Sequence, residues 1–388
     1  MRFALTAAAA SALLVACATE TQETTEIVET EIETSVAEAI EPDGEAMNEA
    51  AEDVATDPYL WMEEVEGEAA LAWVNAQNER SLAIIKSSPV FEDNHAKALE
   101  LATSNDRIPY GTVRDGLVYN FWQDETNVRG VWRRTSLDSY KSDDPEWETV
   151  LDFDKLAADE DKNWVFKGSN CFKPKGADKT LCFVSLSDGG KDAVINREFD
   201  LDAKAFVEDG FETAEAKQGL AWIDHDTVLI GTDWGGDGAT LTESGYPSSV
   251  RLWKRGEALE DATELYVGQK TDVGIWPWSS ELEDGTMIYG AVESDTFFTR
   301  IYYLLQDGEA TAFPLPKKAS LGSDFKGWQF VTLQEDWMVG DETFKTGDLV
   351  AFNLQQFLDT KELPPVELVF RANDRQAVNG VAVSKSAA

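Results

Sequence analysis

The segment Asp178-Lys179-Thr180-Leu181-Cys182-Phe183-Val184 holds the clearest structural signal in the sequence, because a polar turn runs directly into an apolar strand. The same pattern recurs at intervals of 48 to 63 residues. Its leading aspartates are Asp115, Asp178, Asp226, Asp284 and Asp336. This interval is typical of four-stranded β-propeller blades joined by loops of variable length. We therefore expect a mainly β protein, a partial β-propeller of about five blades.

Further strands follow the aspartate-led strands in most repeats. They are expected at Val131–Thr135, Val250–Lys254 and Arg300–Leu305. The dipeptide Asp115-Gly116 before a strand is typical of a hairpin turn, since glycine accepts the positive φ that tight turns need. We assign residues 106–388, which hold these repeats, to the propeller.

The composition fits a folded protein with an extensive core. Hydrophobic residues make up 43% of the 388 residues, with 13 Trp and 19 Phe. The formal charge of −40 excludes nucleic acid as a partner, because a phosphate backbone has to be neutralised by Lys and Arg. A charge of this size favours solubility and does not identify a substrate.

The N-terminus carries a candidate targeting signal. Arg2 precedes an apolar run, Ala4–Val15, which is too short to span a bilayer. The run ends in Leu14-Val15-Ala16-Cys17, which resembles the signal of bacterial lipoproteins. The resemblance implies that residues 1–17 are a signal peptide, that Cys17 is lipidated, and that Ala18 directs the protein to the outer membrane. An ordinary secretory signal with an incidental Cys17 is the alternative.

Residues 18–56 contain no Lys or Arg and are rich in Glu, Thr and Ala. Such a segment repels itself and buries too little apolar surface to fold alone. We expect an acidic, disordered tether that holds the folded part away from a membrane. Together with the lipid at Cys17, the tether implies a protein anchored in the bacterial envelope, at the periplasmic face of the outer membrane.

A short helical segment is expected at residues 57–105, before the propeller. Apolar residues repeat at helical spacing within Ala69–Asn78, with Leu71 and Val74 on one side. A second helix is expected over Phe91–Ala102.

Several longer segments resemble, in the same order, the non-catalytic part of prolyl oligopeptidase family proteins. The first is Asp57-Pro58-Tyr59-Leu60-Trp61-Met62-Glu63-Glu64, which precedes the expected helix at Ala69–Asn78. The other segments are Arg107–Tyr110, Ser185–Gly190, Asn196–Asp200, Phe206–Phe211, Ser244–Pro247 and Leu252–Gly256. Ordered matches along so much of the chain are more specific than one short motif.

The resemblance implies a propeller of about seven blades that covers a separate α/β-hydrolase domain and admits only short, flexible peptides. Family members cleave such peptides after proline, or in some branches after other residues. With about five blades and a last match at Phe370–Val378, we expect an incomplete ring and no hydrolase domain in this chain. Open strand edges then predict marginal stability and a tendency to associate.

No catalytic residue is predicted. The family nucleophile is a serine in a Gly-x-Ser-x-Gly turn, and this pattern does not occur in the sequence. Ser169 and Ser187 lie near glycines but lack the second glycine, so they are assigned to turns or blades. His95 is assigned to a solvated helix position and His225 to a blade turn, which leaves no histidine late enough for the family's Ser-Asp-His order.

No metal or cofactor site is predicted either. The segment Asp233-Trp234-Gly235-Gly236-Asp237-Gly238 is faintly similar to a Ca²⁺ loop, but further carboxylates and a distal Glu are missing. A plain propeller loop is the preferred interpretation.

Cys171 and Cys182 are candidates for a disulfide, which an oxidising compartment allows. A two-residue turn at Gly176-Ala177 places them opposite each other in a hairpin, where they bond if their Cα separation is suitable. Two free thiols in the core are an equally open alternative.

Two functions from different classes remain. The first is the N-terminal and propeller portion of a prolyl oligopeptidase-type serine peptidase acting on short peptides, inactive alone. In this case the missing hydrolase domain is the packing partner, and it leaves Leu60, Trp61, Leu71 and Trp73 of the helical segment uncovered. The second is a stand-alone lipoprotein of the envelope whose propeller binds peptides or another protein.

Overall fold

The computed structural model describes residues 57–64, 67–104 and 106–384, which form two compact units that divide between Ser88 and Pro89. The first unit contains a 3-10 helix, η1 (Leu60–Glu63), and the helix α1 (Glu68–Lys86). Helix α1 continues past its expected end because no Gly or Pro interrupts the sequence before Pro89.

The second unit begins with α2 (Phe91–Thr103), at the expected place, and continues with the sheets. The helix α2 thus belongs to the unit that holds the β-structure, whereas α1 does not. Four further short helices connect strands of this unit: α3 (Leu137–Tyr140), α4 (Phe153–Glu160), η2 (Leu259–Asp261) and α5 (Leu354–Thr360).

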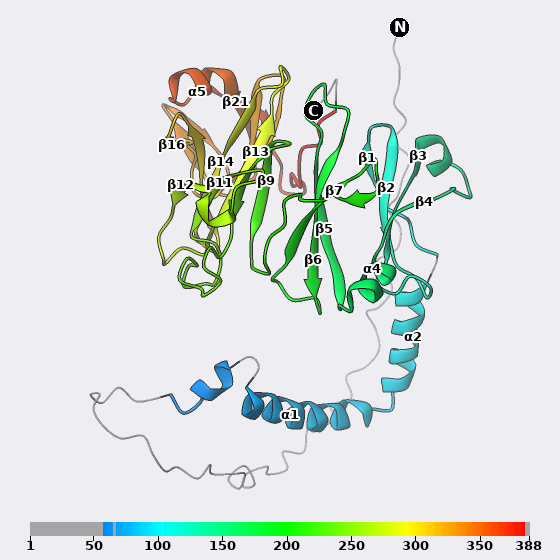
Figure 1. The fold of residues 1–388 in the computed structure, drawn as a ribbon. Helices are drawn as coiled ribbons and strands as arrows, with labels where there is room; N and C mark the ends of the chain where they lie inside the picture. Colours follow the sequence, from blue (N-terminus) through cyan, green and yellow to red (C-terminus); the bar gives the residue numbers. More distant parts are fainter. Residues whose placement is uncertain (1–56, 65–66, 105, 385–388) are drawn as a thin grey trace, which may run out of the picture. The chain divides into compact units, whose positions relative to one another are not determined.

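The strands of the second unit form antiparallel sheets of four strands each (Figure 1). Sheet 1 contains β1 (Thr112–Arg114), β2 (Leu117–Trp122), β3 (Val131–Ser136) and β4 (Glu148–Asp152). Sheet 2 contains β5 (Trp164–Phe172), β6 (Leu181–Asp188), β7 (Ile195–Asp200) and β8 (Ala205–Phe206). Sheet 3 contains β9 (Gly219–Asp224), β10 (Thr227–Gly231), β11 (Ser249–Lys254) and β12 (Thr263–Val267).

Two more sheets follow with the same meander. Sheet 4 contains β13 (Gly274–Glu281), β14 (Met287–Thr296), β15 (Thr299–Gln306) and β16 (Glu309–Ala312). Sheet 5 contains β17 (Ala319–Phe325), β18 (Trp328–Leu333), β21 (Leu349–Asn353) and β22 (Val366–Phe370). Between β18 and β21 the chain forms a separate hairpin of β19 (Trp337–Val339) and β20 (Glu342–Phe344).

Strand β6 shows why the apolar repeats fold as blades. Alternate side chains of a strand point to opposite faces, and both faces of β6 are covered. Cys182, Val184 and Leu186 belong to the core shared with sheet 1, whereas Leu181 and Phe183 belong to the core shared with sheet 3. A strand between two packed sheets therefore needs apolar residues at nearly every position, which is the pattern seen in the sequence.

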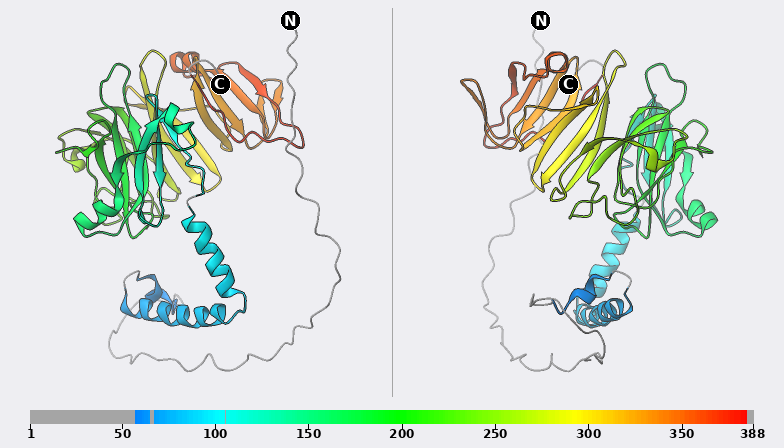
Figure 2. Two further views of the ribbon diagram at one scale, coloured as in Figure 1. Left: turned by 90° about the vertical axis from the view of Figure 1, so that its right-hand side faces the viewer. Right: turned by 60° about the vertical axis from the view of Figure 1, so that its left-hand side comes forward.

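Consecutive sheets share hydrophobic cores. One core joins sheets 1 and 2, a second joins sheets 2 and 3, and two more join sheets 3 and 4 and sheets 4 and 5. The views in Figure 2 show the sheets following one another in chain order. This arrangement is that of a β-propeller with four-stranded blades. The predicted fold class, mainly β with a short helical segment before the sheets, is therefore confirmed.

Four of the five predicted turn aspartates lie between a first and a second strand, but the prediction for Asp336 was wrong. Asp336 precedes β19 of the separate hairpin. In sheet 5 the corresponding turn holds Lys326 and Gly327, with φ of 49° and 77°. A Lys-Gly turn meets the same requirement for positive φ, so this position does not need an aspartate.

The turns define two ends of the sheets, named here by their position in Figure 1. The upper end holds the turns between first and second strands, at residues 115–116, 173–180, 225–226, 282–286 and 326–327. The lower end holds the turns between second and third strands, at residues 123–130, 189–194, 232–248, 297–298 and 334–348. Because every sheet is an antiparallel meander, the turns between third and fourth strands, which include α3 and α5, lie at the upper end as well.

Candidate functional site

The two serines considered as nucleophiles both lie in sheet 2. Ser169 is on β5, opposite Val184 of β6. Ser187 is on β6 and completely buried, and its hydroxyl donates a hydrogen bond to the carbonyl oxygen of Lys191 at 2.9 Å. A nucleophilic serine of an α/β-hydrolase domain needs a sharp strand-to-helix turn. Ser169 and Ser187 occupy regular strand positions instead.

The two histidines are far apart in the fold. His95 is exposed on α2, and its ring stacks on Phe91 with 5.8 Å between centroids. His225 is in the turn between β9 and β10, with its ring edge against Phe172. Within residues 57–384 as described, no hydrogen bond joins either histidine to a serine, and the buried Nε2 of His225 has no partner. These groups form no Ser–His pair for nucleophilic catalysis.

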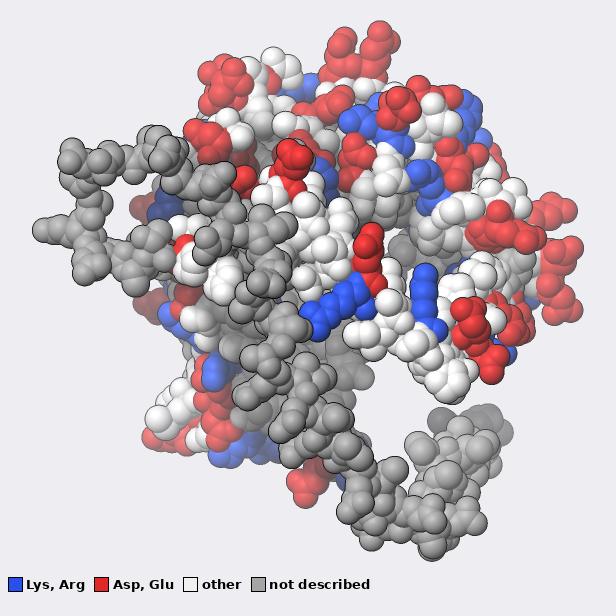
Figure 3. Space-filling model, turned by 90° about the horizontal axis from the view of Figure 1, so that it is seen from below, with Lys and Arg blue, Asp and Glu red and all other residues white. Residues whose placement is uncertain are grey.

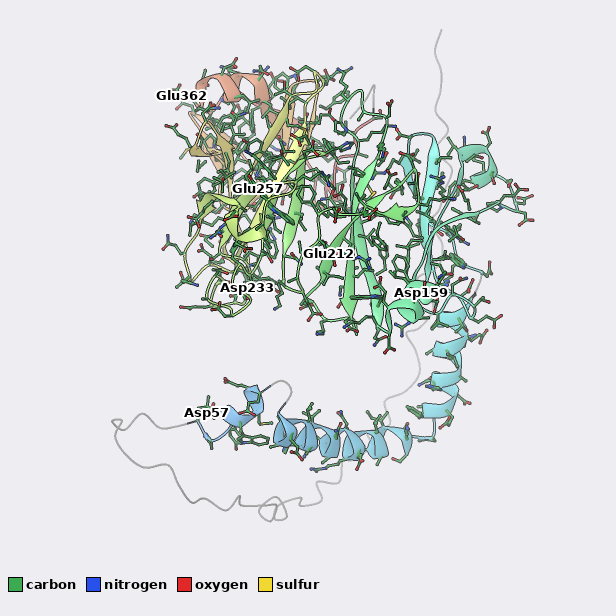
Figure 4. All side chains as sticks on the ribbon, viewed as in Figure 1. Asp57, Asp159, Glu212, Asp233, Glu257 and Glu362 are labelled. Atoms are coloured by element: carbon green, nitrogen blue, oxygen red, sulfur yellow. A yellow bond between two sulfur atoms is a disulfide. The ribbon has the colours of Figure 1, made fainter. Side chains whose placement is uncertain are left out.

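The glycine-rich loop that was compared with a Ca²⁺ site is held by its own carboxylates. Asp233, labelled in Figure 4, accepts hydrogen bonds from the backbone of Gly238 and the hydroxyl of Thr240, both at 2.9 Å. Asp237 accepts one from the backbone of Ala239 at 3.0 Å. In the part of the chain that the structure describes, no group of three His, Cys, Asp or Glu is placed to hold a metal ion.

Cys171 and Cys182 form a disulfide between β5 and β6. The two residues pair directly across the strands, in the register that the sequence predicted. The predicted two-residue turn at Gly176-Ala177 was wrong, since β5 ends at Phe172 and β6 begins at Leu181. Pro174 accounts for the longer loop, because proline lacks the N–H that would extend the pairing.

The lower end of the sheets exposes apolar side chains at its loop tips. Phe297 and Phe298 form the turn between β14 and β15 and are 77% and 72% exposed. Met338 on β19 and Val128 between β2 and β3 are also exposed. Among the described turns of the upper end, no aromatic side chain is exposed to this degree. Exposed apolar side chains at several turns of one end favour a surface that contacts another protein or domain.

Sheet 1 carries a second surface feature, a cavity of about 480 Å³ beside β2. The residues that line it are Arg107, Ile108, Tyr110, Asn120, Phe121, Trp122 and Gln123. Trp122 contacts two guanidinium groups, Arg107 at 4.8 Å and Arg133 at 4.4 Å from its ring centroid. Arg133 also lies 4.3 Å from the ring centroid of Trp147.

Burial lowers the pKa of Arg133 to about 10, and the negative charge of Asp124 opposes this effect. The guanidinium therefore remains charged at neutral pH. Its Nε donates a hydrogen bond to Asn120 Oδ1 at 2.8 Å, which fixes its plane between the rings. Stacked arginine and tryptophan side chains of this kind can bind carbonyl or carboxylate groups, but they supply no group for acid–base catalysis.

Ion pairs join different sheets at the upper end. Arg255 donates two hydrogen bonds of 2.8 Å to the carboxylate of Glu198, whose side chain has no exposed surface. This contact raises the pKa of Arg255. Hydrogen bonds from Arg134 and Lys204 lower the pKa of Glu148 to about 2. Figure 3 shows the molecule from below, where Asp and Glu are widely spread, with Lys and Arg among them.

The first unit exposes the apolar residues that the sequence singled out. Leu60 and Trp61 of η1 and Leu71 and Trp73 of α1 are between 38% and 50% exposed. No helix among the described residues is long and apolar enough to cross a membrane. Cys17 and the expected tether at residues 18–56 lie outside the described residues.

Sequence reasoning missed the exposed pair Phe297-Phe298 and the stack of Trp122, Arg133 and Trp147. A signal for the pair was present, since two phenylalanines lie between Thr296 and Thr299, where alternation in a strand would bury only one. The stack had no such signal, because Trp122 is on β2, Arg133 is on β3 and Trp147 directly precedes β4, so they meet only in the folded sheet.

Comparison with known proteins agrees with the arrangement of the sheets. The family model described as prolyl oligopeptidase, N-terminal beta-propeller domain, matches residues 39–366. The chain is 36% identical over 361 residues to the uncharacterized peptidase y4nA of Sinorhizobium fredii, with 91% of this chain and 48% of that protein covered. It is 30% identical over 340 residues to the uncharacterized peptidase RP174 of Rickettsia prowazekii, with 84% and 46% covered. The chain thus spans about half the length of the curated relatives it matches.

Solved structures give the same result. A post-proline cleaving enzyme from Rickettsia typhi is similar with a TM-score of 0.74 and 29% identity, over 83% of this chain and 48% of that one. Oligopeptidase B from Trypanosoma brucei is similar in fold, with a TM-score of 0.56 and 16% identity over 84% of this chain and 43% of that one.

Proposed function

The chain belongs to the prolyl oligopeptidase family as the propeller domain of a family peptidase, and from this we propose that it serves a serine peptidase that hydrolyses short peptides after proline. The observation that carries the proposal is the similarity to the Rickettsia typhi enzyme, which is named for post-proline cleavage. The curated relatives are themselves named as peptidases. Since the chain spans about half of their length, peptidase activity is proposed for the whole protein.

In this proposal the propeller is a steric filter for peptide substrates, and its lower end is the face that contacts the hydrolase domain. A hydrolase domain covers Phe297, Phe298, Val128 and Met338 and removes their exposed apolar surface from water. The exposed residues of η1 and α1 need a partner for the same reason. Placed over a catalytic domain, the propeller excludes folded proteins and leaves room for short, flexible peptides.

We propose further that residues 1–388 have no peptidase activity alone, since the described part supplies no Ser–His pair. The test is hydrolysis of benzyloxycarbonyl-Gly-Pro-p-nitroanilide by the purified chain. No release of nitroaniline is expected, whereas release that a serine-reactive phosphonate blocks contradicts the proposal. Reading the coding sequence beyond residue 388 tests the other half of it, because the peptidase requires a downstream Gly-x-Ser-x-Gly region.

A stand-alone module that binds peptides or a protein is the second candidate, and the cavity with Arg107, Trp122 and nearby Arg133 favours it. Calorimetric titration of the purified chain with proline-containing peptides separates the two. Binding that Trp122→Ala abolishes, in a monomeric and cooperatively folding chain, supports the module. Absence of peptide binding supports the first candidate, in which the propeller restricts access to a peptidase domain.

We propose that a lipid on Cys17 anchors the protein to the periplasmic face of the outer membrane. Cells that express the full chain are labelled with radioactive palmitate and fractionated. Cys17→Ser is expected to lose the label and leave the membrane fraction. Ala18→Asp is the matched control, expected to keep the label but stay in the inner membrane. A labelled Cys17→Ser protein contradicts the proposal.

A further inference from the structure

The hairpin between β5 and β6 makes contacts that a blade of a propeller does not ordinarily make. Its tip, residues 173–180, belongs to sheet 2 at the upper end. The backbone N–H of Lys175 donates a hydrogen bond to Glu281 Oε1 at 2.8 Å, and Lys175 Nζ donates one to the carbonyl oxygen of Glu283 at 2.9 Å. Glu281 is the last residue of β13 in sheet 4, and Glu283 lies in the turn that follows.

These contacts join sheet 2 to sheet 4, which are not adjacent. Sheet 3 lies between sheets 2 and 4, since it shares one core with sheet 2 and another with sheet 4. In a ring of blades each blade packs against its two neighbours. Strand β9 of sheet 3 contacts both β5 and β13, so the tip of sheet 2 reaches sheet 4 on the side of the blades where these first strands lie.

The same tip is also tied to sheet 1. Lys173 Nζ forms an ion pair with Asp115 at 3.2 Å, in the first turn of sheet 1. Arg114 donates a hydrogen bond to the carbonyl oxygen of Cys171 at 3.3 Å. The tip therefore connects three sheets, two of which are not neighbours of each other.

Local features suit the hairpin to this position. The Cys171–Cys182 disulfide closes its base. Gly285, with φ of 93°, lies under the Lys175 side chain, and a Cβ at this position would lie 3.4 Å from Lys175 Cδ. The tip also carries three lysines: Lys173 pairs with Asp115 of sheet 1, and Lys179 pairs with Asp200 of sheet 2 itself.

We propose that residues 173–180 are a strap across the centre of the upper end, closed at its base by the disulfide and anchored by Lys173 and Lys175, which bars a polypeptide from passing through that end. Combined with the proposed peptidase function, the strap leaves the lower end and its margins as the route for substrate. This consequence rests on the proposed function, whereas the strap itself does not.

The anchor is tested in the full chain by hydrogen–deuterium exchange of the peptide that covers residues 173–180. Glu281→Ala removes the acceptor of the Lys175 amide, so exchange of this peptide is expected to become at least about tenfold faster. Glu283→Ala is the matched control, because Glu283 contributes only its backbone carbonyl, and exchange is expected to stay unchanged. Glu281→Gln keeps an acceptor oxygen and is expected to restore the slow rate.

Two further measurements complete the test of the strap. Asp115→Asn removes the ion pair with Lys173 but keeps the turn, since asparagine tolerates the φ of 49° at this position, and faster exchange is expected here also. Addition of the reductant dithiothreitol under denaturing conditions is expected to raise the mass by two hydrogen atoms, as the Cys171–Cys182 disulfide is reduced to two thiols. Equal exchange in Glu281→Ala and Glu283→Ala, or alkylation of both thiols in the native protein, overturns the proposal.

The consequence for substrate is measured in the complete peptidase. Glu281→Ala combined with Asp115→Asn is expected to raise kcat/KM for a proline-containing peptide of about thirty residues, relative to benzyloxycarbonyl-Gly-Pro-p-nitroanilide, by about threefold or more. An unchanged ratio overturns the barrier role. Absence of hydrolysis of the small substrate by the wild type contradicts the proposed function instead, so the two failures are distinguishable.

Discussion

The two ends of the propeller unit hold their turns in different ways. At the upper end, charged side chains connect one sheet to another, as Arg255 of sheet 3 does with Glu198 of sheet 2. Lys204 of sheet 2 likewise pairs with Glu148 of sheet 1. At the lower end, ion pairs such as Lys345–Asp336 stay within one sheet.

The two ends also differ in how much apolar side-chain surface they expose to solvent. The lower end exposes Phe297 and Phe298 almost fully, whereas the upper turns keep their aromatic residues covered. Hydrogen bonds join neighbouring sheets at the lower end as well, as from Arg129 Nη1 to the carbonyl oxygen of Trp164 at 3.1 Å, so the apolar loop tips are what distinguish this end. The exposed apolar tips indicate that the lower end is suited to contact with a partner.

Removal of a tie between sheets is the largest expected effect on stability. Glu198→Ala leaves the guanidinium of Arg255 without its buried partner and the backbone N–H of Phe211 without its acceptor. We expect the free energy of unfolding to fall by about 3 kcal/mol or more. Urea denaturation followed by tryptophan fluorescence measures the change.

Asp226→Asn is the control for this prediction. Asp226 pairs with the same Arg255 but is 77% exposed, so the expected loss is below about 1 kcal/mol. An equal loss of unfolding free energy in the two variants would show that the buried pair between sheets contributes no more than the exposed one. The proposed difference between the two ends would then be contradicted.

Much of the fold was predictable because strands between packed sheets carry a strong pattern. Every residue from Leu181 to Val184 is buried, so the apolar run of β6 is visible in the sequence without any tertiary information. The same holds for Val228, Leu229 and Ile230 of β10. The number of residues in each blade follows from this pattern and from the turns that begin with an aspartate.

The parts that escaped prediction depend on contacts between distant residues. Lys175 and Glu281 are 106 positions apart, and nothing in either local sequence indicates the other. The separate hairpin at Trp337 was assigned to a blade turn because it too follows an aspartate, Asp336. Exposure of Phe297 and Phe298 was missed for another reason: a phenylalanine is by default assigned to the core, although two adjacent phenylalanines cannot both be buried by strand alternation.

An ion pair within one sheet is expected to contribute less than the pair between sheets. Asp348 is buried between β20 and β21, and Arg371 donates hydrogen bonds to both of its carboxylate oxygens, at 3.0 and 2.6 Å. Asp348→Asn keeps the shape but removes the charge, so we expect a loss of about 1.5–2 kcal/mol at pH 7. Denaturation at several pH values measures it.

The pH dependence of this variant has a definite sign. Hydrogen bonds from Arg371 hold the pKa of Asp348 below its ordinary value. The folded state thus binds the proton less readily than the unfolded chain, and the contribution is complete above an unfolded pKa of about 4. It is lost as the pH falls through the lower, folded pKa. A difference between wild type and Asp348→Asn that stays constant down to pH 3 contradicts this account.

The smallest effect on stability is expected where the contact surface is proposed. Phe297→Ser combined with Phe298→Ser alters side chains that are exposed at the lower end, so the free energy of unfolding should change by less than about 0.5 kcal/mol. Sedimentation velocity over a range of concentrations should nevertheless show less self-association, because the variant removes apolar surface. Leu137→Ser, at the upper end, is the control and should leave association unchanged. If both variants reduce association equally, the apolar tips of the lower end are not a distinct contact surface.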